Sequence, residues 1–267
     1  MTSEARYFAA DAEYQAELTR RRIGEVECDP LTVRYLLRLG VGDGWRCLEV
    51  GAGAGSIARW LSHSVGPNGS VVAADINTRF LDDLSGGNIE VRRTDITQDE
   101  LEADAYDFVH CRWLLMHLDE PAEALHRMAR ALRPGGWLLV EEVDGRSMAA
   151  IDSAHPLAGG FNATTQKRLQ ALRDRGIIDA YLGGLLPRLL AEAGLGDVTH
   201  EGIARIISGG SGWSTYLQET WRLIDGRFVE EGLLSGADVT TSRLAHVDAS
   251  FQYRDLTLDA AWGRRRD

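Results

Sequence analysis

A glycine-rich stretch with a carboxylate in front of it is the first feature of this sequence that could bind a ligand. The stretch Glu49–Ser56 follows an apolar run that predicts a strand and opens a segment that predicts a helix, and its glycines are Gly51, Gly53 and Gly55. Glycines at a strand-to-helix turn let the backbone approach a nucleotide closely. The stretch therefore predicts a nucleotide-type site at the end of the strand.

Glu49 bears on which nucleotide this site accepts. A dinucleotide coenzyme places its pyrophosphate on the glycine turn and the helix N-terminus, and its fingerprint requires glycine where this chain has Ser56. A carboxylate at Glu49 would repel the pyrophosphate. The residues thus favour a cofactor that carries positive charge and no phosphate. A dehydrogenase is the disfavoured alternative, which NADH binding would support.

Two further carboxylates follow the next two predicted strands. Asp75 comes roughly 20 to 25 residues after the turn, where a carboxylate accepts ribose hydroxyls. Asp95 stands beside the apolar Ile96, a pair that suits the amine and the face of adenine. Each aspartate has a plainer reading, as a helix N-cap or a turn residue. Together with Glu49 they predict one crevice for an adenosine-type ligand.

Short apolar runs alternate with amphipathic segments, which is typical of a parallel α/β sheet. The expected strands are Arg46–Val50, Ser70–Ala74, Ile89–Arg93, Tyr106–His110 and Trp137–Val143. The helices expected between them are Ser56–Ser64, Thr78–Leu84, Gln98–Leu101 and Pro121–Leu132. Further on we expect helices over Ala163–Arg175, Leu185–Ala193 and Trp213–Leu234, and strands over Asp197–Ile207 and Ala249–Trp262.

The part before the first strand predicts two helices. One covers Glu13–Ile23, and the second begins at Asp29 as N-cap with Pro30 in its first turn. We expect residues 1–44 to form a helical cap and residues 45–267 to form the main domain. Segments near 149–183 and 209–248 are expected to be lid insertions that close over the crevice.

Composition narrows the class of protein. The 267 residues carry a net charge of −11, which disfavours nucleic acid as a partner. No apolar run is long enough for a membrane span, and no signal peptide is recognised. The three cysteines have no paired spacing, which indicates a cytoplasmic protein without a structural metal site. The oligomeric state is left open.

These features together resemble the class I S-adenosylmethionine-dependent methyltransferases. The resemblance rests on the glycine turn with Glu49, on Asp75, on Asp95-Ile96, on the strand Tyr106–Val109 and on the stretch Leu132–Gly136, and it covers about residues 45–145. It implies a Rossmann-like, seven-stranded, mostly parallel sheet in the order 3-2-1-4-5-7-6 with the last strand antiparallel. Among the small-molecule branches, the chain is most similar to the ubiquinone and menaquinone-type enzymes.

The resemblance also implies a set of cofactor contacts for S-adenosylmethionine and its product S-adenosylhomocysteine. Glu49 and Gly51 would serve the methionine part, Asp75 the ribose, Ile76 the adenine face, and Asp95 with the Ile96 amide the adenine edge. The complete set of expected cofactor-binding residues is Glu49, Gly51, Ala52, Gly53, Gly55, Asp75, Ile76, Asp95, Ile96, His110 and Cys111.

Acceptor contacts and a base are expected from the residues after the fourth and fifth strands and from the lid. The motif that methyltransferases of planar amines share is absent at His110–Trp113, which counts against adenine and glutamine as acceptors. His117 and His155 are the candidate bases; the plainer readings are a structural histidine and a surface histidine. The expected acceptor-binding residues are Arg112, Trp113, Glu142, Trp213 and Tyr216.

The sequence therefore predicts an enzyme that moves a methyl group in line from S-adenosylmethionine to a small, hydrophobic or aromatic metabolite, such as a quinone or another natural product. One alternative is an enzyme of the same fold that binds the cofactor and catalyses another reaction, such as cyclisation. Another is a cofactor-binding module without catalysis, which would have no buried acceptor pocket.

Overall fold

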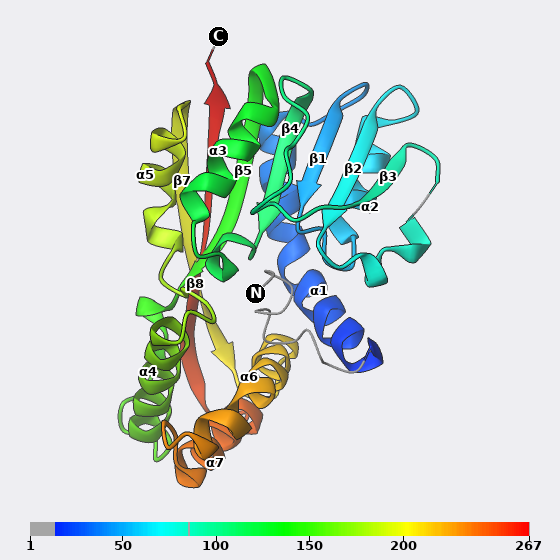
Figure 1. Ribbon diagram of the computed structural model, residues 1–267. Coiled ribbons are helices and arrows are strands. Elements are labelled where there is room, and N and C mark those ends of the chain that lie inside the picture. The colour runs from blue at the N-terminus through cyan, green and yellow to red at the C-terminus, as the bar shows by residue number, and fades with distance from the viewer. Residues whose placement is uncertain (1–13, 85, 267) are drawn as a thin grey trace.

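The computed structural model describes residues 14–84 and 86–266. It is a Rossmann-like α/β fold built on one mostly parallel sheet, as Figure 1 shows. In the described residues the strands are β1 (Arg46–Val50), β2 (Ser70–Asp75), β3 (Ile89–Arg93), β4 (Tyr106–Arg112), β5 (Leu132–Asp144), β6 (Ala149–Ala150), β7 (Leu195–Ser208) and β8 (Gln252–Arg265). The sheet runs β3-β2-β1-β4-β5-β8, and β8 is antiparallel to β5.

The remaining two strands both pair with β8. β7 lies antiparallel to β8 along nearly its whole length. With β8 as the seventh expected strand and β7 as the sixth, the order matches the expected 3-2-1-4-5-7-6. β6 is an additional two-residue strand that pairs with β8 past the point where β5 ends. The sequence did not predict β6, because two alanines carry no strand pattern.

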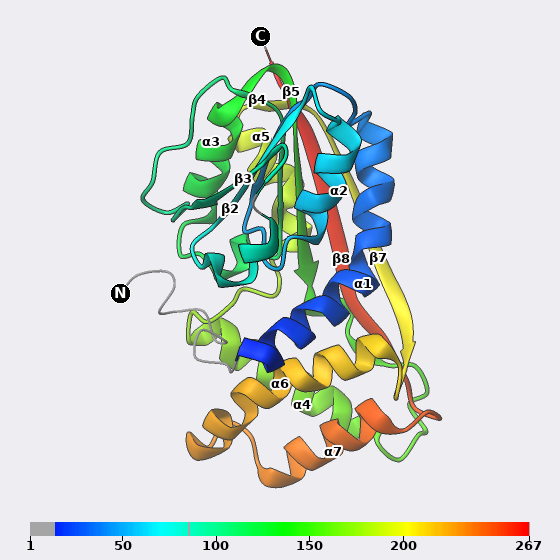
Figure 2. The same ribbon diagram turned by 90° about the vertical axis from the view of Figure 1, so that its right-hand side faces the viewer.

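Helices cover both faces of the sheet (Figure 2). They are α1 (Tyr14–Leu39), α2 (Ser56–Val65), α3 (Pro121–Ala131), α4 (Ala158–Asp174), α5 (Leu186–Glu192), α6 (Gly212–Glu230) and α7 (Gly236–Val247). α1 and α2 pack on one face through side chains such as Leu36 and Leu61. α3 and α5 pack on the other face through Leu125 and Leu190.

The expectation of two N-terminal helices was wrong. α1 is one helix of 26 residues with Pro30 inside it, and it changes direction partway along in Figure 2. A proline inside a helix removes one hydrogen bond and kinks the helix at a cost of about 3 kcal/mol. Buried residues on both sides, Cys28 and Tyr35 among them, offset that cost. Asp29 lies inside α1, and its carboxylate accepts hydrogen bonds from Ser56 and Arg112.

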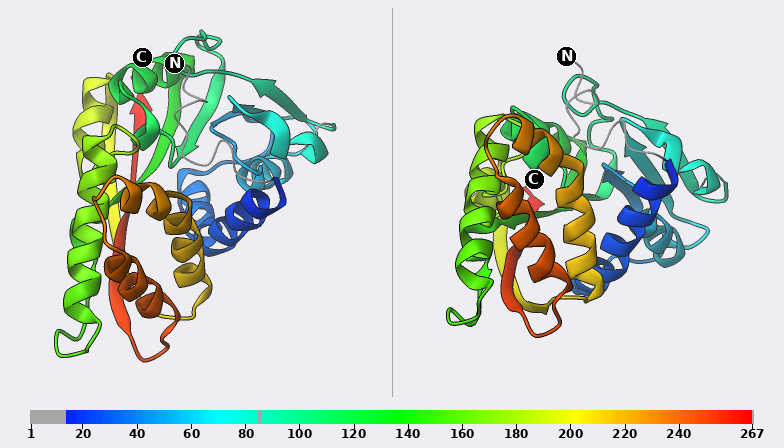
Figure 3. Two further views of the ribbon diagram at one scale, coloured as in Figure 1. Left: turned by 60° about the horizontal axis from the view of Figure 1, so that its bottom comes forward. Right: turned by 90° about the horizontal axis from the view of Figure 1, so that it is seen from below.

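α4, α6 and α7 gather below the sheet around the lower ends of β7 and β8 (Figures 1 and 3). They share a cluster of buried apolar side chains that includes Phe161, Trp213 and Tyr253. α1 packs beside α6, so the N-terminal helix reaches this group. α7 lies past the segment we expected to be helical; its N-cap is Ser235, which forms a capping box with Asp238.

Two predicted short helices take other forms. The segment Thr78–Leu84 forms two separate 3-10 turns, and Gln98–Leu101 forms a turn in place of a helix. In the second case the Asp95 side chain accepts from the Thr97 amide and holds a turn. Segments of four to seven residues are too short for α-helix nucleation without packing. In the parts of the chain that the structure describes, no helix is long and apolar enough to cross a membrane.

Candidate active site

The glycine turn lies directly after β1 and forms one wall of a cavity of about 250 Å³. Gly51 and Gly53 have positive φ values of 76° and 64°, a backbone region that glycine adopts without strain. Both line the cavity together with Glu49 and Ala52. Gly55, the fifth residue expected here, does not line it: a Cβ at that position would lie 2.1 Å from Leu84, so its glycine serves packing.

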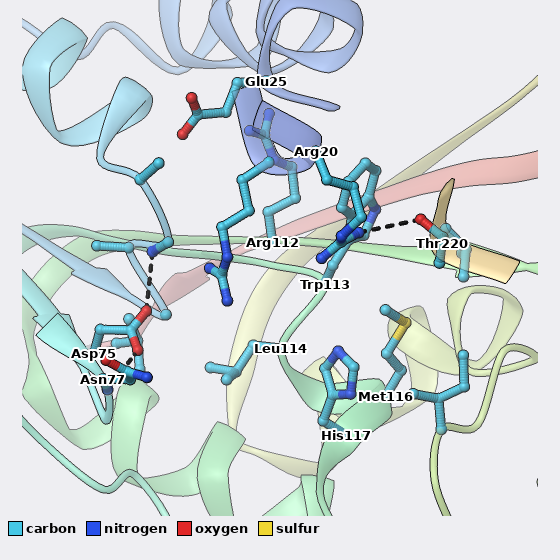
Figure 4. A pocket seen from close by; sticks show the side chains of 18 of the residues that line it. Arg20, Glu25, Asp75, Asn77, Arg112, Trp113, Leu114, Met116, His117 and Thr220 are labelled. Atoms are coloured by element: carbon cyan, nitrogen blue, oxygen red, sulfur yellow. Dashed lines mark hydrogen bonds between the residues drawn. The ribbon is translucent and has the colours of Figure 1, made fainter. Parts of the chain in front are cut away.

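Asp75 ties the end of β2 to the glycine turn. Its Oδ2 accepts from the Gly53 amide at 2.9 Å, and its Oδ1 accepts from the Asn77 amide at 2.9 Å (Figure 4). Burial raises the pKa of the Asp75 carboxyl, and the backbone donors oppose this effect. The carboxylate lines the cavity with lone pairs still available, as a group that binds two vicinal hydroxyls requires.

Three other expected residues complete this cofactor end. Ile76, Asp95 and Ile96 all line the cavity, from the ends of β2 and β3. Asp95 also organises the turn that follows it, because its Oδ1 accepts from the Thr97 hydroxyl at 2.6 Å. The residues expected at three successive strand ends are therefore brought to one cavity.

His110 and Cys111 are not among the residues that line the cavity. Cys111 is fully buried in the core on the α3 side of the sheet. His110 is also fully buried, with Nε2 3.0 Å from Glu141 Oε2 and Nδ1 3.6 Å from Glu49 Oε1. Their strand, β4, is central and covered on both faces, which keeps both side chains inside the sheet layers.

The cavity continues from the cofactor end to an aromatic wall. The rings of Trp213 and Tyr216 stack with centroids 4.8 Å apart, and Trp113 lies 6.0 Å from Tyr216. All three line the cavity, two from α6 and one from the end of β4. Trp113 has a φ of 54°, an uncommon conformation for a bulky residue that often marks functional sites.

Arginines contribute the polar part of the wall. Arg20, from α1, binds Glu17 through Nε and Nη2, and its Nη1 donates to Tyr216 and Thr220 (Figure 4). Arg112 lines the cavity as expected, with its guanidinium held by Asp29 at 2.8 Å.

Sequence reasoning missed several residues of the cavity wall, among them Arg20, Arg21 and Glu25 of α1 and Met116, Leu217 and Thr220. The α1 residues carried no signal, because a run of charged residues on a helix usually faces solvent.

His117 lies on the cavity wall beside Met116, in the 3-10 turn Leu115–His117 (Figure 4). Burial and the nearby charges of Arg21 and Arg20 lower the pKa of its imidazole to about 4. The ring is therefore neutral at neutral pH and is a weak base. Its position makes it a hydrogen-bonding group of the wall.

Glu142 and His155 do not line this cavity. Glu142 lies under the 3-10 turn, where its Oε1 accepts from the amides of Leu114 and Leu115. Burial raises the pKa of the Glu142 carboxyl to about 8. His155 packs against Phe251 in the helical group below the sheet, with its Nε2 3.9 Å from Asp248. Neither side chain is placed to touch an acceptor in the cavity.

A Rossmann-like sheet in this strand order, with a glycine turn and acidic strand ends around one cavity, is the arrangement of class I S-adenosylmethionine-dependent methyltransferases. Comparison with protein families agrees, because residues 48–140 match the family described as "Methyltransferase domain". Residues 48–140 therefore carry a methyltransferase domain, in agreement with the predicted family, for which S-adenosylmethionine is the predicted cofactor.

The chain is similar to the ubiquinone/menaquinone biosynthesis C-methyltransferase UbiE of Pseudomonas fluorescens (strain Pf0-1). The two are 34% identical over 131 residues, which cover 46% of this chain and 51% of that relative. The match thus spans about half the length of the relative.

Two solved structures share the fold. One is phosphoethanolamine N-methyltransferase 2 of Haemonchus contortus, bound to S-adenosylhomocysteine, at TM-score 0.56 and 15% identity over 89% of this chain and 53% of that one. The other is the [4+2]-cyclase SpnF, at TM-score 0.50 and 18% identity over 89% of this chain and 80% of that one. At these identities the likeness describes the fold.

Proposed function

We propose that this protein transfers a methyl group from S-adenosylmethionine to a small, aromatic or hydrophobic acceptor. The single observation that carries the proposal is that one cavity joins Asp75 and Asp95 at one end to the aromatic wall of Trp113, Trp213 and Tyr216 at the other. A donor seated at the acidic strand ends would point toward that wall.

The cofactor supplies an electrophilic methyl group on a sulfonium. The residues of the chain position it: Asp75 takes the ribose hydroxyls, Asp95 and Ile96 take the adenine, and Glu49 faces the methionine part. The acceptor ring packs against Trp113 and Tyr216, which hold its nucleophilic atom in line with the methyl group and exclude water. Such positioning supplies much of the rate of a displacement of this kind.

The proton lost by the acceptor goes to solvent or to a group of the acceptor itself in this proposal. His117 is a weak base at neutral pH, so we assign it a hydrogen bond to the acceptor. The described part of the expected N-terminal cap, residues 14–44, and the segments 149–183 and 209–248 are proposed to close the cavity, since α1 and α6 both contribute wall residues.

Labelled methyl transfer tests the proposal. The protein is incubated with methyl-labelled S-adenosylmethionine and a panel of quinols, phenols and polycyclic aromatic ketones, and products are followed by mass spectrometry. We expect label in at least one aromatic acceptor and equal formation of S-adenosylhomocysteine. The variant Asp75→Ala should lose both products, while Asp83→Asn, at an exposed position outside the cavity, should keep them.

Cyclisation without methyl transfer is the second candidate, and the likeness of the fold to the [4+2]-cyclase SpnF favours keeping it. The cavity with its aromatic wall would hold a folded apolar substrate for methyl transfer as well as for cyclisation. Conversion of an acceptor without loss of label from the cofactor would identify this candidate. Binding of the cofactor with no conversion of any acceptor would leave a cofactor-binding module.

A further inference from the structure

Three ionisable side chains from neighbouring strands form a row on the face of the sheet that α1 and α2 cover. Glu49 comes from β1, His110 from β4 and Glu141 from β5. His110 Nε2 is hydrogen-bonded to Glu141 Oε2 at 3.0 Å, and Nδ1 lies 3.6 Å from Glu49 Oε1. The imidazole, fully buried, therefore stands between two carboxylates.

The charges in this row determine the protonation of His110. Burial disfavours the imidazolium, but the hydrogen bond to Glu141 and the charges of Glu141 and Glu49 outweigh it and raise the pKa of His110. Two buried carboxylates without a cation between them would be strongly unfavourable. The position between two carboxylates therefore favours the imidazolium form of His110.

The elements around the row offer few other charges. α1 presents Cys28 and Tyr35, and burial raises the pKa of both groups, that of Cys28 to about 12, so both are neutral. Arg112, on β4, interacts with Glu141 but is held by Asp29 at 2.8 Å. His110 is thus the cation that contacts Glu49 directly within the described residues.

Glu49 connects this row to the cavity. It is 5% exposed and lines the cofactor end, beside Gly51. Its Oε2 is buried and has no hydrogen-bond partner in residues 14–84 and 86–266. A buried oxygen of this kind is costly unless a donor reaches it, and the α-ammonium of the methyl donor is such a donor.

We propose that His110 is a positioning residue for the cofactor: its ring, held by Glu141, orients the Glu49 carboxylate toward the methionine ammonium. This inference rests on the proposed function, because it assumes that the methionine part lies at Glu49. His110 itself touches neither the cofactor nor the acceptor.

Loss of the imidazolium has a specific consequence. In His110→Gln the two buried carboxylates lose the cation between them, which favours uptake of a proton. Glu49 must then lose a proton before it can bind the ammonium, and affinity should weaken roughly tenfold for each pH unit below that ionisation. The unchanged protein should bind with nearly constant affinity over the same pH range.

Calorimetry on the full chain tests this with two probes at pH 5.5, 6.5 and 7.5. S-adenosylhomocysteine carries the ammonium, and 5′-methylthioadenosine lacks the whole amino-acid part. The variants are His110→Gln and the matched control His126→Gln, which replaces an exposed histidine of α3. We expect His110→Gln to weaken S-adenosylhomocysteine binding at least tenfold at pH 5.5, progressively less as pH rises, and to leave 5′-methylthioadenosine unaffected.

A second measurement does not depend on the folding of a variant. Nitrogen-15 spectra of the histidine rings in the unchanged protein should show His110 protonated on both ring nitrogens at pH 7. A neutral ring there would overturn the inference.

The inference would also be overturned if His110→Gln weakened the binding of both probes equally, or weakened S-adenosylhomocysteine binding by the same factor at every pH. Either result would indicate a purely structural role. If the unchanged protein binds 5′-methylthioadenosine but His110→Gln keeps full affinity for S-adenosylhomocysteine, the inference fails and the proposed function stands. If the unchanged protein binds neither probe, both fail.

Discussion

The Glu142 Oε1 lies 2.6 Å from the backbone nitrogen of Leu115, so a side chain of the sheet holds the turn that carries His117. The same oxygen accepts from the Leu114 amide at 3.0 Å. The two bonds fix the start of the 3-10 turn against the end of β5. Glu142 therefore shapes the cavity wall from behind, without contacting the cavity.

Replacing Glu142 by glutamine should change how stability depends on pH. Burial raises the pKa of Glu142 to about 8, so the folded state holds a proton that the unfolded state releases above about pH 4.5. The stability that this proton gives the folded state is complete below pH 4.5. It is lost as pH rises to about 8, by at most about 1.4 kcal/mol per pH unit. The glutamine side chain of Glu142→Gln cannot ionise, and its oxygen can still accept from the amides of Leu114 and Leu115.

Urea unfolding at pH 5 and pH 9 measures this effect. The stability of Glu142→Gln relative to the unchanged protein should increase between the two pH values. Glu192→Gln, at an exposed position on α5, serves as control and should show no such change. A pH-independent difference for Glu142→Gln would mean that the carboxyl is ionised throughout.

Asp75→Ala should weaken binding of S-adenosylhomocysteine by about 1–3 kcal/mol, the usual loss when buried polar groups lose a partner. The substitution also removes the acceptor of the Gly53 amide, so the glycine turn loses a bond to β2. Calorimetry checks the affinity, with Asp83→Asn as control. Unchanged affinity in Asp75→Ala would exclude the ribose role.

The scaffold of the cofactor end could be predicted from the sequence because its signals are local. β1 and β3 have the bounds that their apolar runs predicted; Glu49 lies at the end of β1, and Asp95 follows β3 by two residues. α1 was predicted as two helices, because Pro30 carries a local signal for a helix start. Packing against the sheet and against α6 overrides that signal, and packing is invisible in a single sequence.

The acceptor end was predicted only where the residue type is distinctive. Trp113, Trp213 and Tyr216 stood out as aromatic residues, and the structure brings them together from β4 and α6. Arg20 and Thr220 lie 200 positions apart, and no sequence spacing indicates that they would meet. His155 was expected near the end of β5; the chain instead carries it to Phe251, below the sheet.

His117→Gln should leave the shape of the pH–rate profile unchanged between pH 6 and 9. Since burial and the neighbouring arginines lower the pKa of His117 to about 4, its imidazole is neutral throughout this range. Turnover should fall by less than about 10-fold, against the 10²- to 10⁴-fold loss typical of a general base. The measurement is kcat/KM for an identified acceptor as a function of pH. Disappearance of an ionisation near pH 6–7 in the variant would restore His117 as a base.

Tyr216 should contribute to binding of the acceptor and not to binding of the cofactor. Its ring stacks on Trp213, and its hydroxyl accepts from Arg20 at 3.3 Å. Tyr216→Ala removes an aromatic contact worth about 0.5–1.5 kcal/mol, so KM for an aromatic acceptor should rise roughly 2- to 10-fold. Tyr216→Phe keeps the ring, so KM for the acceptor should stay close to that of the unchanged protein. Leu223→Ala, at a partly exposed site on the same helix, is the control for changes in α6. If Tyr216→Ala weakens S-adenosylhomocysteine binding as much as it raises the acceptor KM, the aromatic wall belongs to the cofactor site, and the acceptor must bind elsewhere in the cavity.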